Sequence, residues 1–384
     1  MRRSTNRILT THCGSLARPK ELLDLMKAKL DGTLPNDETY TRQVRNTVVK
    51  TVRQQVENGI DIVTDGEQSK SGFFAYVNER LSGFAPKPGT SFTFFADEVA
   101  AFPEYYKEYF SQAMLGGTVA PLVPLACTGP VSYRGQEAAR GDIENLKAAL
   151  AGVKPEEVFL PAVAPSGVGM NEYYRTEEEY LHAVADAMRT EYQAIVDAGF
   201  IVQIDDPFLT DIYSDSSLNA ADRQKKAEIY VSALNHGLRR IPAEKIRFHT
   251  YYGINEGPRI HDAQLKDVVD AMLKVNAGAY SFEAANARHE HEYHLWETVQ
   301  LPEGKILIPG VITHASNIVE HPEFIAERII RYAKLVGREN VIAGADCGFS
   351  SQATYHPEVH PTVVWAKFRA LAEGARLATK QLWR

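Results

Sequence analysis

Short apolar runs rich in β-branched residues alternate along the chain with longer amphipathic stretches. Such alternation is typical of βα units whose strands form a parallel sheet. Eight units predict an α/β fold, a closed (β/α)8 TIM barrel. An open doubly wound sheet is disfavoured because no G-x-G-x-x-G follows the first run. The predicted strands cover residues 7–13, 60–65, 157–164, 199–205, 245–251, 278–283, 305–312 and 340–346. The predicted helices cover residues 38–58, 176–197, 218–238, 264–275, 321–336 and 359–379.

A long insertion between the second and third predicted strands interrupts this alternation. Residues 68–156 contain the runs TSFTFFAD, TVAPLVPLACTGPVSY and FPEYYKEYF, which predict a hairpin, followed by a helix at 142–151. Three roles are open for the insertion: a lid over the barrel mouth, a contact between subunits of a homo-oligomer, or a structural decoration. No repeat or low-complexity linker divides the chain, so residues 1–384 are predicted to form a single barrel domain.

Composition and charge narrow the functional class. The chain is 44% hydrophobic and 24% charged, with a formal net charge of -7, and it therefore lacks the overall basic character of nucleic-acid-binding proteins. Its three cysteines are spread along the sequence, which disfavours a disulfide framework and predicts a cytoplasmic location. Neither a secretory signal nor an apolar run long enough for a membrane span is visible, so no membrane partner is expected.

Candidate chemistry lies at the ends of the predicted strands, where barrel enzymes place their active sites. These ends carry Thr11 to Ser15, Asp65 to Glu67, Pro165 to Gly167, Asp205 and Asp206, His249 to Tyr251, Glu283, Thr313 and His314, and Asp346 to Gly348. The abundance of His, Cys, Asp and Glu exceeds what simple capping by polar residues would require. We therefore expect an enzyme.

Three of these residues supply the ligand types of a catalytic zinc site, which keeps three protein ligands and one open position. His249 offers nitrogen, Glu283 oxygen and Cys347 sulfur. Spacing alone leaves other roles open: a structural histidine, a buried paired carboxylate and an inert buried thiol. Cys13 and Cys127 are interpreted as packing residues.

The run RHEHEYH at 288–294 has the composition of a metal-binding tract. A solvated helix start with acidic residues in its first turn is the simpler interpretation. Arg288 and His289 are candidates for contact with substrate.

These motifs together resemble the catalytic barrel of cobalamin-independent methionine synthase. They are closer still to the short single-barrel relatives, which include epoxyalkane:coenzyme M transferase. The resemblance covers nearly the whole chain. It rests on THCGSLARP at 11–19, TDGE at 64–67, QIDDP at 203–207, HTYYGINEGP at 249–258, FEAANARHEHE at 282–292 and ADCGFS at 345–350.

The resemblance implies a zinc enzyme that activates a small thiol for attack on an alkyl carbon. The family's ligands are a His-x-Cys pair, a Glu and a later Cys, of which His249, Glu283 and Cys347 match three. Tyr251 stands where the pair has its Cys. Three interpretations follow: zinc stays on the three ligands, Tyr251 ligates as a phenolate, or the metal is absent and these residues act as acid, base or nucleophile.

The resemblance also implies how the substrate is held. Main-chain N–H groups of Gly14 and Ser15 would meet a carboxylate, and Glu67 with Asp205 would hold an amino group. Tyr251 would donate a proton in the lost ligand's place. The expected reaction is zinc-dependent alkyl or methyl transfer to or from a small thiol, or a related C–S lyase step, with an alkyl donor as second substrate. The alternative is a metal-independent lyase or hydrolase on the same barrel that uses Tyr251, Cys347 and His249.

Overall fold

The fold is described from a computed structural model that covers residues 1–384 except 74, 88–94, 115–116 and 254–255. Two motifs named above fall partly in these gaps. Residues 90–94 of TSFTFFAD and residues 254–255 of HTYYGINEGP lie outside the described residues. No helix in the described ranges is both long and apolar enough to cross a membrane.

Eight parallel strands form the centre of the molecule in the order β1-β11-β10-β9-β8-β7-β5-β2. A parallel bridge between Thr11 and Ile62 brings the two outer strands of this sheet together, so the predicted barrel is confirmed. Each predicted run contains one strand. The strands are β1 (Leu9–Thr10), β2 (Ile62–Val63), β5 (Glu157–Val163), β7 (Ile201–Asp205), β8 (Ile246–His249), β9 (Ala279–Phe282), β10 (Ile306–Ile312) and β11 (Ile342–Ala345).

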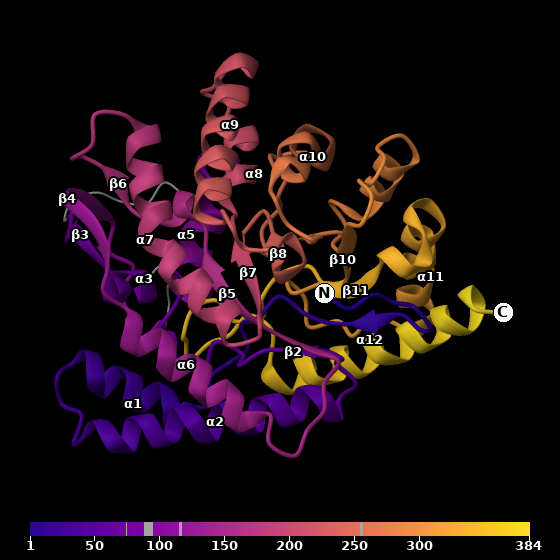
Figure 1. Cartoon of the computed structure of the whole chain (residues 1–384), viewed down its shortest axis with the longest axis horizontal. Helices are drawn as coiled ribbons and strands as arrows, with labels where there is room; N and C mark the ends of the chain where they lie inside the picture. The colour runs from indigo at the N-terminus through magenta and orange to yellow at the C-terminus, as the bar shows by residue number, and fades with distance from the viewer. Residues whose placement is uncertain (74, 88–94, 115–116, 254–255) are drawn as a thin grey trace.

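Helices surround the barrel on the outside (Figure 1). Their starts follow from capping residues in the sequence: Asn36, Thr176 and Asn219 each accept a hydrogen bond from a backbone N–H of the first helical turn. The predicted helix at 142–151 begins earlier, at Gln136, and two unpredicted helices follow β1 and β7. The helices that cover the barrel are α1 (Lys20–Leu30), α2 (Asp37–Glu57), α6 (Gln136–Ala149), α7 (Glu177–Asp197), α8 (Phe208–Ser214), α9 (Ala220–Gly237), α10 (Leu265–Lys274), α11 (Pro322–Val336) and α12 (Pro361–Leu382).

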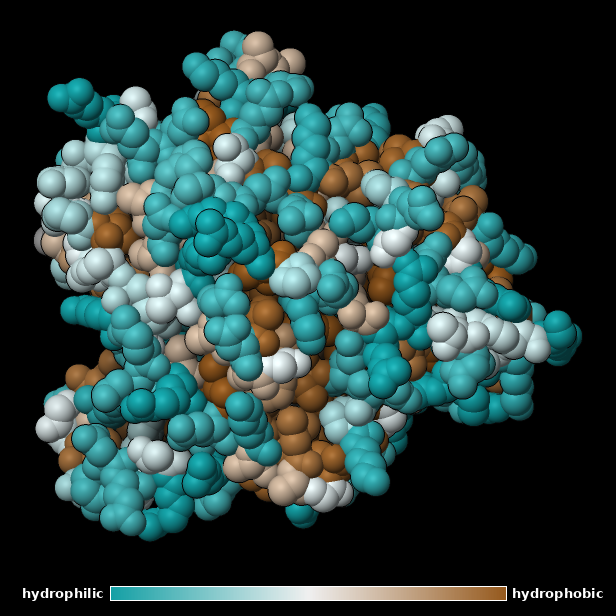
Figure 2. Space-filling model, in the orientation of Figure 1, coloured by the Kyte–Doolittle hydropathy of each residue, from teal (hydrophilic) through white to brown (hydrophobic). Residues whose placement is uncertain are grey.

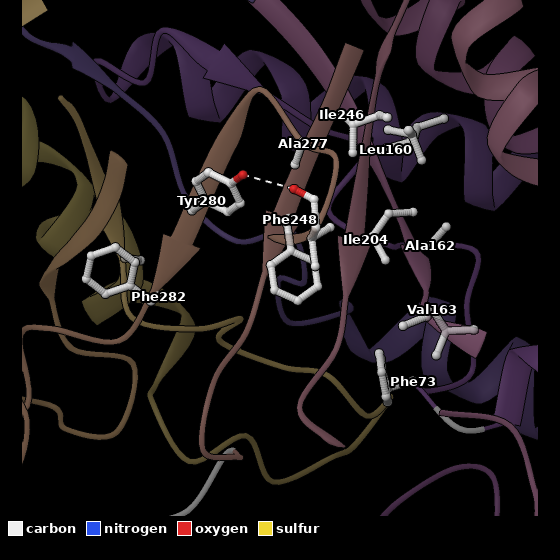
Figure 3. Packing of buried hydrophobic residues seen from close by; sticks show 14 of the residues in the cluster. Phe73, Leu160, Ala162, Val163, Ile204, Ile246, Phe248, Ala277, Tyr280 and Phe282 are labelled. Carbon is white, nitrogen blue, oxygen red and sulfur yellow. Dashed lines mark hydrogen bonds between the residues drawn. The ribbon is translucent and has the colours of Figure 1, made fainter. Parts of the chain in front are cut away.

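Alternating strand residues divide the apolar core into two clusters. Residues such as Phe248, Tyr280 and Phe282 belong to the large cluster that also contains the buried faces of the helices (Figure 3). Residues at the starts of the strands form a second cluster with no helical member, which fills one end of the barrel. Its buried members are Leu9, Ile62, Phe159, Ile201, Ala279, Ile306, Ile308 and Ile342. On the face shown in Figure 2, hydrophilic residues cover most of the surface.

Arg247 marks the change from this apolar layer to a polar one. Its guanidinium lies 4.5 Å from the Phe159 ring centroid and donates to Thr11 Oγ1 at 2.9 Å and to the carbonyl of His12 at 2.6 Å. The polar layer continues toward the carboxyl ends of the strands, where the candidate site lies.

The insertion contains the predicted hairpin. Strands β3 (Leu81–Pro86) and β4 (Leu125–Tyr133) are antiparallel, and β6 (Met170–Asn171) adds to β4. Between them lie α4 (Ala96–Ala101), α5 (Pro103–Tyr109) and the π-helix η1 (Phe110–Met114), with α3 (Ala75–Arg80) before the hairpin. Tyr109 donates a short hydrogen bond to Glu358, and Glu98 accepts one from the backbone of His261. The inserted helices therefore contact loops that follow β11 and β8, on the side of the barrel that carries the predicted site.

Candidate active site

One pocket at the carboxyl ends of the strands gathers most of the predicted site residues. Glu67, Asp205, His249, Tyr251 and Cys347, all predicted from sequence, line it. The complete lining is Cys13, Ser15, Glu67, Phe73, Asp205, His249, Tyr251, Cys347, Gly348 and Ser351.

Two buried carboxylates form one wall of the pocket. Asp205 accepts a hydrogen bond from Gln203 at 2.7 Å, while burial and the nearby charge of Glu67 hold the pKa of Asp205 well above its usual range. Lys70 forms an ion pair with Glu67, with 3.9 Å between Lys70 Nζ and Glu67 Oε2. Glu67 has this one ion-pair contact and Asp205 has none among the described residues, so both carboxylates can accept a cationic group of a ligand.

The backbone around Glu67 is unusual in a way that fits a binding role. Glu67 has a positive φ of 56°, a conformation that costs energy for a residue with a side chain. Its N–H donates to Asp65 Oδ1 at 2.9 Å, which holds the turn in place. Gly14, predicted to bind substrate through its backbone, packs so closely that an added Cβ would lie 3.0 Å from Glu67 Oε1.

The adjacent Asp206 has a different role. Its carboxylate accepts hydrogen bonds from Ser166 Oγ at 2.8 Å and from the backbone N–H of Leu209 at 3.1 Å, at the start of α8. Asp206 therefore caps a helix, and Asp205 is the member of the pair that faces the pocket.

His249, Tyr251 and Cys347 line the same pocket as neutral groups. Burial, with a smaller contribution from Arg247, lowers the pKa of His249 to about 3. Burial also raises the pKa values of the Tyr251 phenol and the Cys347 thiol well above their usual ranges. The rings of His249 and Tyr251 stack with centroids 4.7 Å apart, and His249 Nε2 is buried with no hydrogen-bond partner.

Cys13 also lines the pocket, although it was interpreted from the sequence as a packing residue. Its sulfur lies 4.0 Å from His249 Nδ1 and donates to the carbonyl of Ala345 at 3.0 Å. Its position after β1 and directly before Gly14 is the feature of the sequence that could have indicated a place in the site.

Glu283 is turned away from this pocket. Its carboxylate pairs with Arg259 Nη1 at 2.8 Å and accepts hydrogen bonds from the N–H of Tyr252 at 3.0 Å and from Asn286 Nδ2 at 2.9 Å. The donor atoms of His249, Glu283 and Cys347 are thus not gathered into one group. In the described part of the chain, the one gathered group of three possible metal ligands is Glu283, His314 and Asp346, with donor atoms all within 4.8 Å of one another.

Residues of the run RHEHEYH do not line the pocket. Arg288 and His289 instead contact Arg259 and Tyr252, the residues that bind Glu283. Residues from Glu290 to Glu297 form the 3-10 helix η4, and His289 is buried, so the predicted solvated helix start is wrong for this residue. The His289 ring stacks on Tyr252 with centroids 3.9 Å apart. Arg288 Nε donates to the carbonyl of Arg259 at 3.0 Å. Both predicted substrate residues therefore lie outside the pocket lining.

Comparisons with known proteins agree with this architecture. Residues 165–363 match the family described as cobalamin-independent synthase, catalytic domain. A methionine synthase of Sulfolobus acidocaldarius is 24% identical over 88% of this chain and 85% of its own length. One of Saccharolobus solfataricus is 22% identical over 98% of this chain and 96% of its own length.

Solved structures share the fold. A B12-independent methionine synthase from Shewanella, in complex with selenomethionine, superimposes with a TM-score of 0.73 at 19% identity, covering 98% of this chain and 99% of that one. A putative vitamin-B12-independent methionine synthase from Listeria monocytogenes gives 0.66 at 18% identity, covering 97% and 98%. The predicted lyase reaction finds no support among these relatives. The chain belongs to the cobalamin-independent synthase family and is an enzyme, a methyltransferase.

Proposed function

We propose that this enzyme transfers a methyl group to the thiol sulfur of a small amino acid of the homocysteine type. The observation that carries this proposal is the pair of buried carboxylates, Glu67 and Asp205, in the same pocket as Tyr251 and Cys347. Such a pair suits the ammonium group of an amino acid, because a buried charge needs a partner of opposite sign. The methionine synthases among its relatives support the same substrate class.

The pocket also suits the other end of an amino acid. Ser15 lines the pocket, and Gly14 precedes it on the same turn. We propose that this turn meets the substrate carboxylate, while Asp205 and Glu67 hold the ammonium group. The side chain of the substrate would then extend toward His249, Tyr251 and Cys347.

The transfer forms a bond between sulfur and methyl carbon as the bond from that carbon to the donor breaks. The thiol proton must end on the donor's leaving atom. Tyr251 is the group we propose for this task, because its phenol lines the pocket beside Cys347 and Asp205 and is the hydroxyl donor that stands in the place of the family's cysteine. The phenol gives its proton to the leaving atom and takes up the proton of the substrate thiol.

Zinc is the metal that the family resemblance implies, and it would lower the pKa of a bound thiol so that the thiolate forms near neutral pH. His249, with its unpartnered Nε2, and the buried Cys347 have the donor types that zinc accepts. Glu283 belongs both to the ligand set predicted with them and to the gathered group with His314 and Asp346. We therefore propose Glu283 as a ligand in either arrangement.

The test is a methyl-transfer assay with homocysteine and a panel of methyl donors, with the thioether product detected by mass spectrometry. Asp205→Asn should raise KM for homocysteine by about 30-fold or more, since losing one partner of a buried charge pair costs about 2 kcal/mol or more. The exposed Asp186→Asn is the control. A thiol that lacks the amino group should be insensitive to Asp205→Asn, and an equal loss with both thiols would contradict the proposed ammonium site.

A further inference from the structure

Arg18, in the motif THCGSLARP, is a buried arginine beside the pocket that the proposed chemistry does not use. Its side chain is only 4% exposed and is not part of the pocket lining. The hydrogen bonds of its guanidinium go to main-chain carbonyls rather than to carboxylates. A buried charge is costly, so the place of this arginine in the fold needs a physical reason.

The carbonyls that bind the guanidinium belong to three different loops. Nη1 donates to the carbonyl of Leu16 at 3.3 Å and to that of Ser350. Nη2 donates to the carbonyl of Glu67 at 2.8 Å and to that of Lys70 at 2.9 Å. Leu16 follows β1, Glu67 and Lys70 follow β2, and Ser350 follows β11. One planar group, with four Nη N–H donors, therefore contacts all three loops at once.

These three loops are neighbours at the mouth of the barrel. Strand β1 pairs with β11 on one side and is joined to β2 on the other by the bridge that closes the barrel. Main-chain hydrogen bonds run from Leu16 to Gly66 at 3.1 Å and from Phe349 to Ser15 at 3.0 Å. Each loop supplies part of the pocket lining, namely Ser15, Glu67, and Gly348 with Ser351. A change in the position of these loops would therefore change the shape of the pocket.

Glu67 is the pocket residue that depends most directly on Arg18. Its φ of 56° is strained for a residue with a side chain. Its N–H donates to Asp65, while its carbonyl accepts from Arg18 and from the N–H of Lys70 at 3.1 Å. Both main-chain polar groups are thus held, which fixes the direction of the carboxylate. Without the guanidinium the strained turn would keep fewer contacts and could relax.

The charge of Arg18 also matches this position. Burial lowers the pKa of Arg18, and the nearby charges of Glu67 and Asp65 oppose that effect. An arginine keeps its proton in a protein, so a positive charge lies close to the carboxylate wall. A lysine at this position would keep the charge, but its single nitrogen could not reach carbonyls on three loops as a planar guanidinium does.

We propose that Arg18 is a positioning residue, whose guanidinium fixes the loops after β1, β2 and β11 and so sets the place of the Glu67 carboxylate that binds the ammonium group of an amino-acid thiol. The inference rests on the proposed function, and it adds the residue that keeps the ammonium site in its geometry. Arg18 itself makes no contact with the substrate, because its side chain does not line the pocket.

Methyl-transfer kinetics of the full-length enzyme with two thiols test this role. The thiols are homocysteine and γ-mercaptobutyrate, which is the same molecule without the ammonium group. Arg18→Lys and Arg18→Gln are compared with the control Arg328→Gln. Arg328 is also buried and donates to two carbonyls, those of Val311 and Ala285, but it does not line the pocket. Circular dichroism and urea unfolding establish that each variant is folded.

The expected result is a loss that depends on the ammonium group. A binding group displaced by about 1 Å can cost about 100-fold. Both Arg18→Lys and Arg18→Gln should therefore raise KM for homocysteine by about 100-fold while kcat stays unchanged. KM for γ-mercaptobutyrate should stay close to the wild-type value in both variants. Arg328→Gln should lower stability and leave the ratio of the two KM values unchanged.

Chemical rescue of Arg18→Ala gives a second measurement, which a general loss of stability would not produce. Guanidinium chloride is added at a concentration far below that which unfolds proteins. The ion can enter the space left by the side chain and donate to the same carbonyls, which an ammonium ion cannot span. We expect guanidinium to lower KM for homocysteine, and ammonium chloride at the same concentration to leave it high.

Several outcomes would overturn the inference while the proposed function stands. They are a folded Arg18→Gln or Arg18→Lys variant with wild-type KM for homocysteine, an equal rise of KM for both thiols, and an equal response of Arg18→Ala to the two ions. If Arg18→Gln does not fold, Arg18→Lys and the rescue of Arg18→Ala decide. A wild-type enzyme that methylates no thiol from any donor would instead overturn the proposed function.

Discussion

Gly310 in β10 is the position where a single added carbon should be most damaging to the candidate site. A Cβ at Gly310 would overlap Asp346 Oδ1 and lie 2.7 Å from both the Cα and the backbone nitrogen of Asp346. Backbone atoms in a buried strand cannot move aside cheaply. Gly310→Ala must therefore shift either β10 or the start of the loop after β11.

The expected loss of stability follows from these contacts. Overpacking of a buried site costs about 1–3 kcal/mol. Displacing Asp346 Oδ1 also weakens its hydrogen bonds from Ala284 and Ala285, and a hydrogen bond to a charged group is worth about 1.5–3 kcal/mol. We expect Gly310→Ala to lower the free energy of unfolding by about 3–6 kcal/mol, a large part of the roughly 5–15 kcal/mol of a typical domain.

Urea unfolding monitored by circular dichroism measures this loss, with Gly141→Ala as the matched control. Gly141 lies within α6, and an added Cβ there would meet nothing within 4 Å. Its replacement should stabilise the protein by about 0.5–1 kcal/mol, because alanine favours helix over glycine. A loss below about 1 kcal/mol for Gly310→Ala would refute the close approach of β10 to Asp346.

Three further predictions concern charged and polar groups near the pocket. Arg259→Gln leaves Glu283 without its buried cation and should lower the free energy of unfolding in urea by about 3–5 kcal/mol. The control Arg331→Gln, at a more exposed ion pair, should lower it by about 1 kcal/mol or less. Equal losses for the two variants would contradict this prediction. Burial alone would lower the pKa of His289, but hydrogen bonds to two carboxylates raise it to about 9, above the unfolded value of 6.5. The stability from this shift is therefore complete below pH 6.5 and is lost as the pH rises toward 9, by about 3 kcal/mol at most, and His289→Gln should flatten that part of the pH profile. Tyr251→Phe should lower kcat by about 100-fold or more while KM for the thiol stays unchanged, and unchanged kcat would exclude the phenol as proton donor.

The barrel was predictable because its signals are local. Runs such as those at β7 and β10 combine β-branched residues with complete burial, and the long helices repeat apolar residues at helical spacing. The short helix α8 was not predicted, since seven residues carry too little periodicity to be recognised. The prediction that residues 1–384 form one domain stays a prediction.

The candidate site was predictable residue by residue but not as a set of contacts. The rule that active sites lie at the carboxyl ends of barrel strands selected Glu67, Asp205, Tyr251 and Cys347, which share one pocket. It could not determine the direction in which Glu283 points. That direction depends on Arg259, which lies far along the chain from the end of β9.

Arg259 and Tyr251 together explain why the ligands matched by sequence are separated in space. Tyr251 supplies no thiolate, so the pocket next to His249 and Cys347 has one anionic ligand fewer than the family pattern. Arg259, with a positive φ of 57°, places a cation against Glu283 and so draws the remaining carboxylate to the other side. Without Arg259, Glu283 would be a buried carboxylate without its cation. The ion pairs of Arg259 with Glu283 and Asp262 therefore hold the Glu283 carboxylate apart from His249 and Cys347, and the three ligands matched by sequence stay separated.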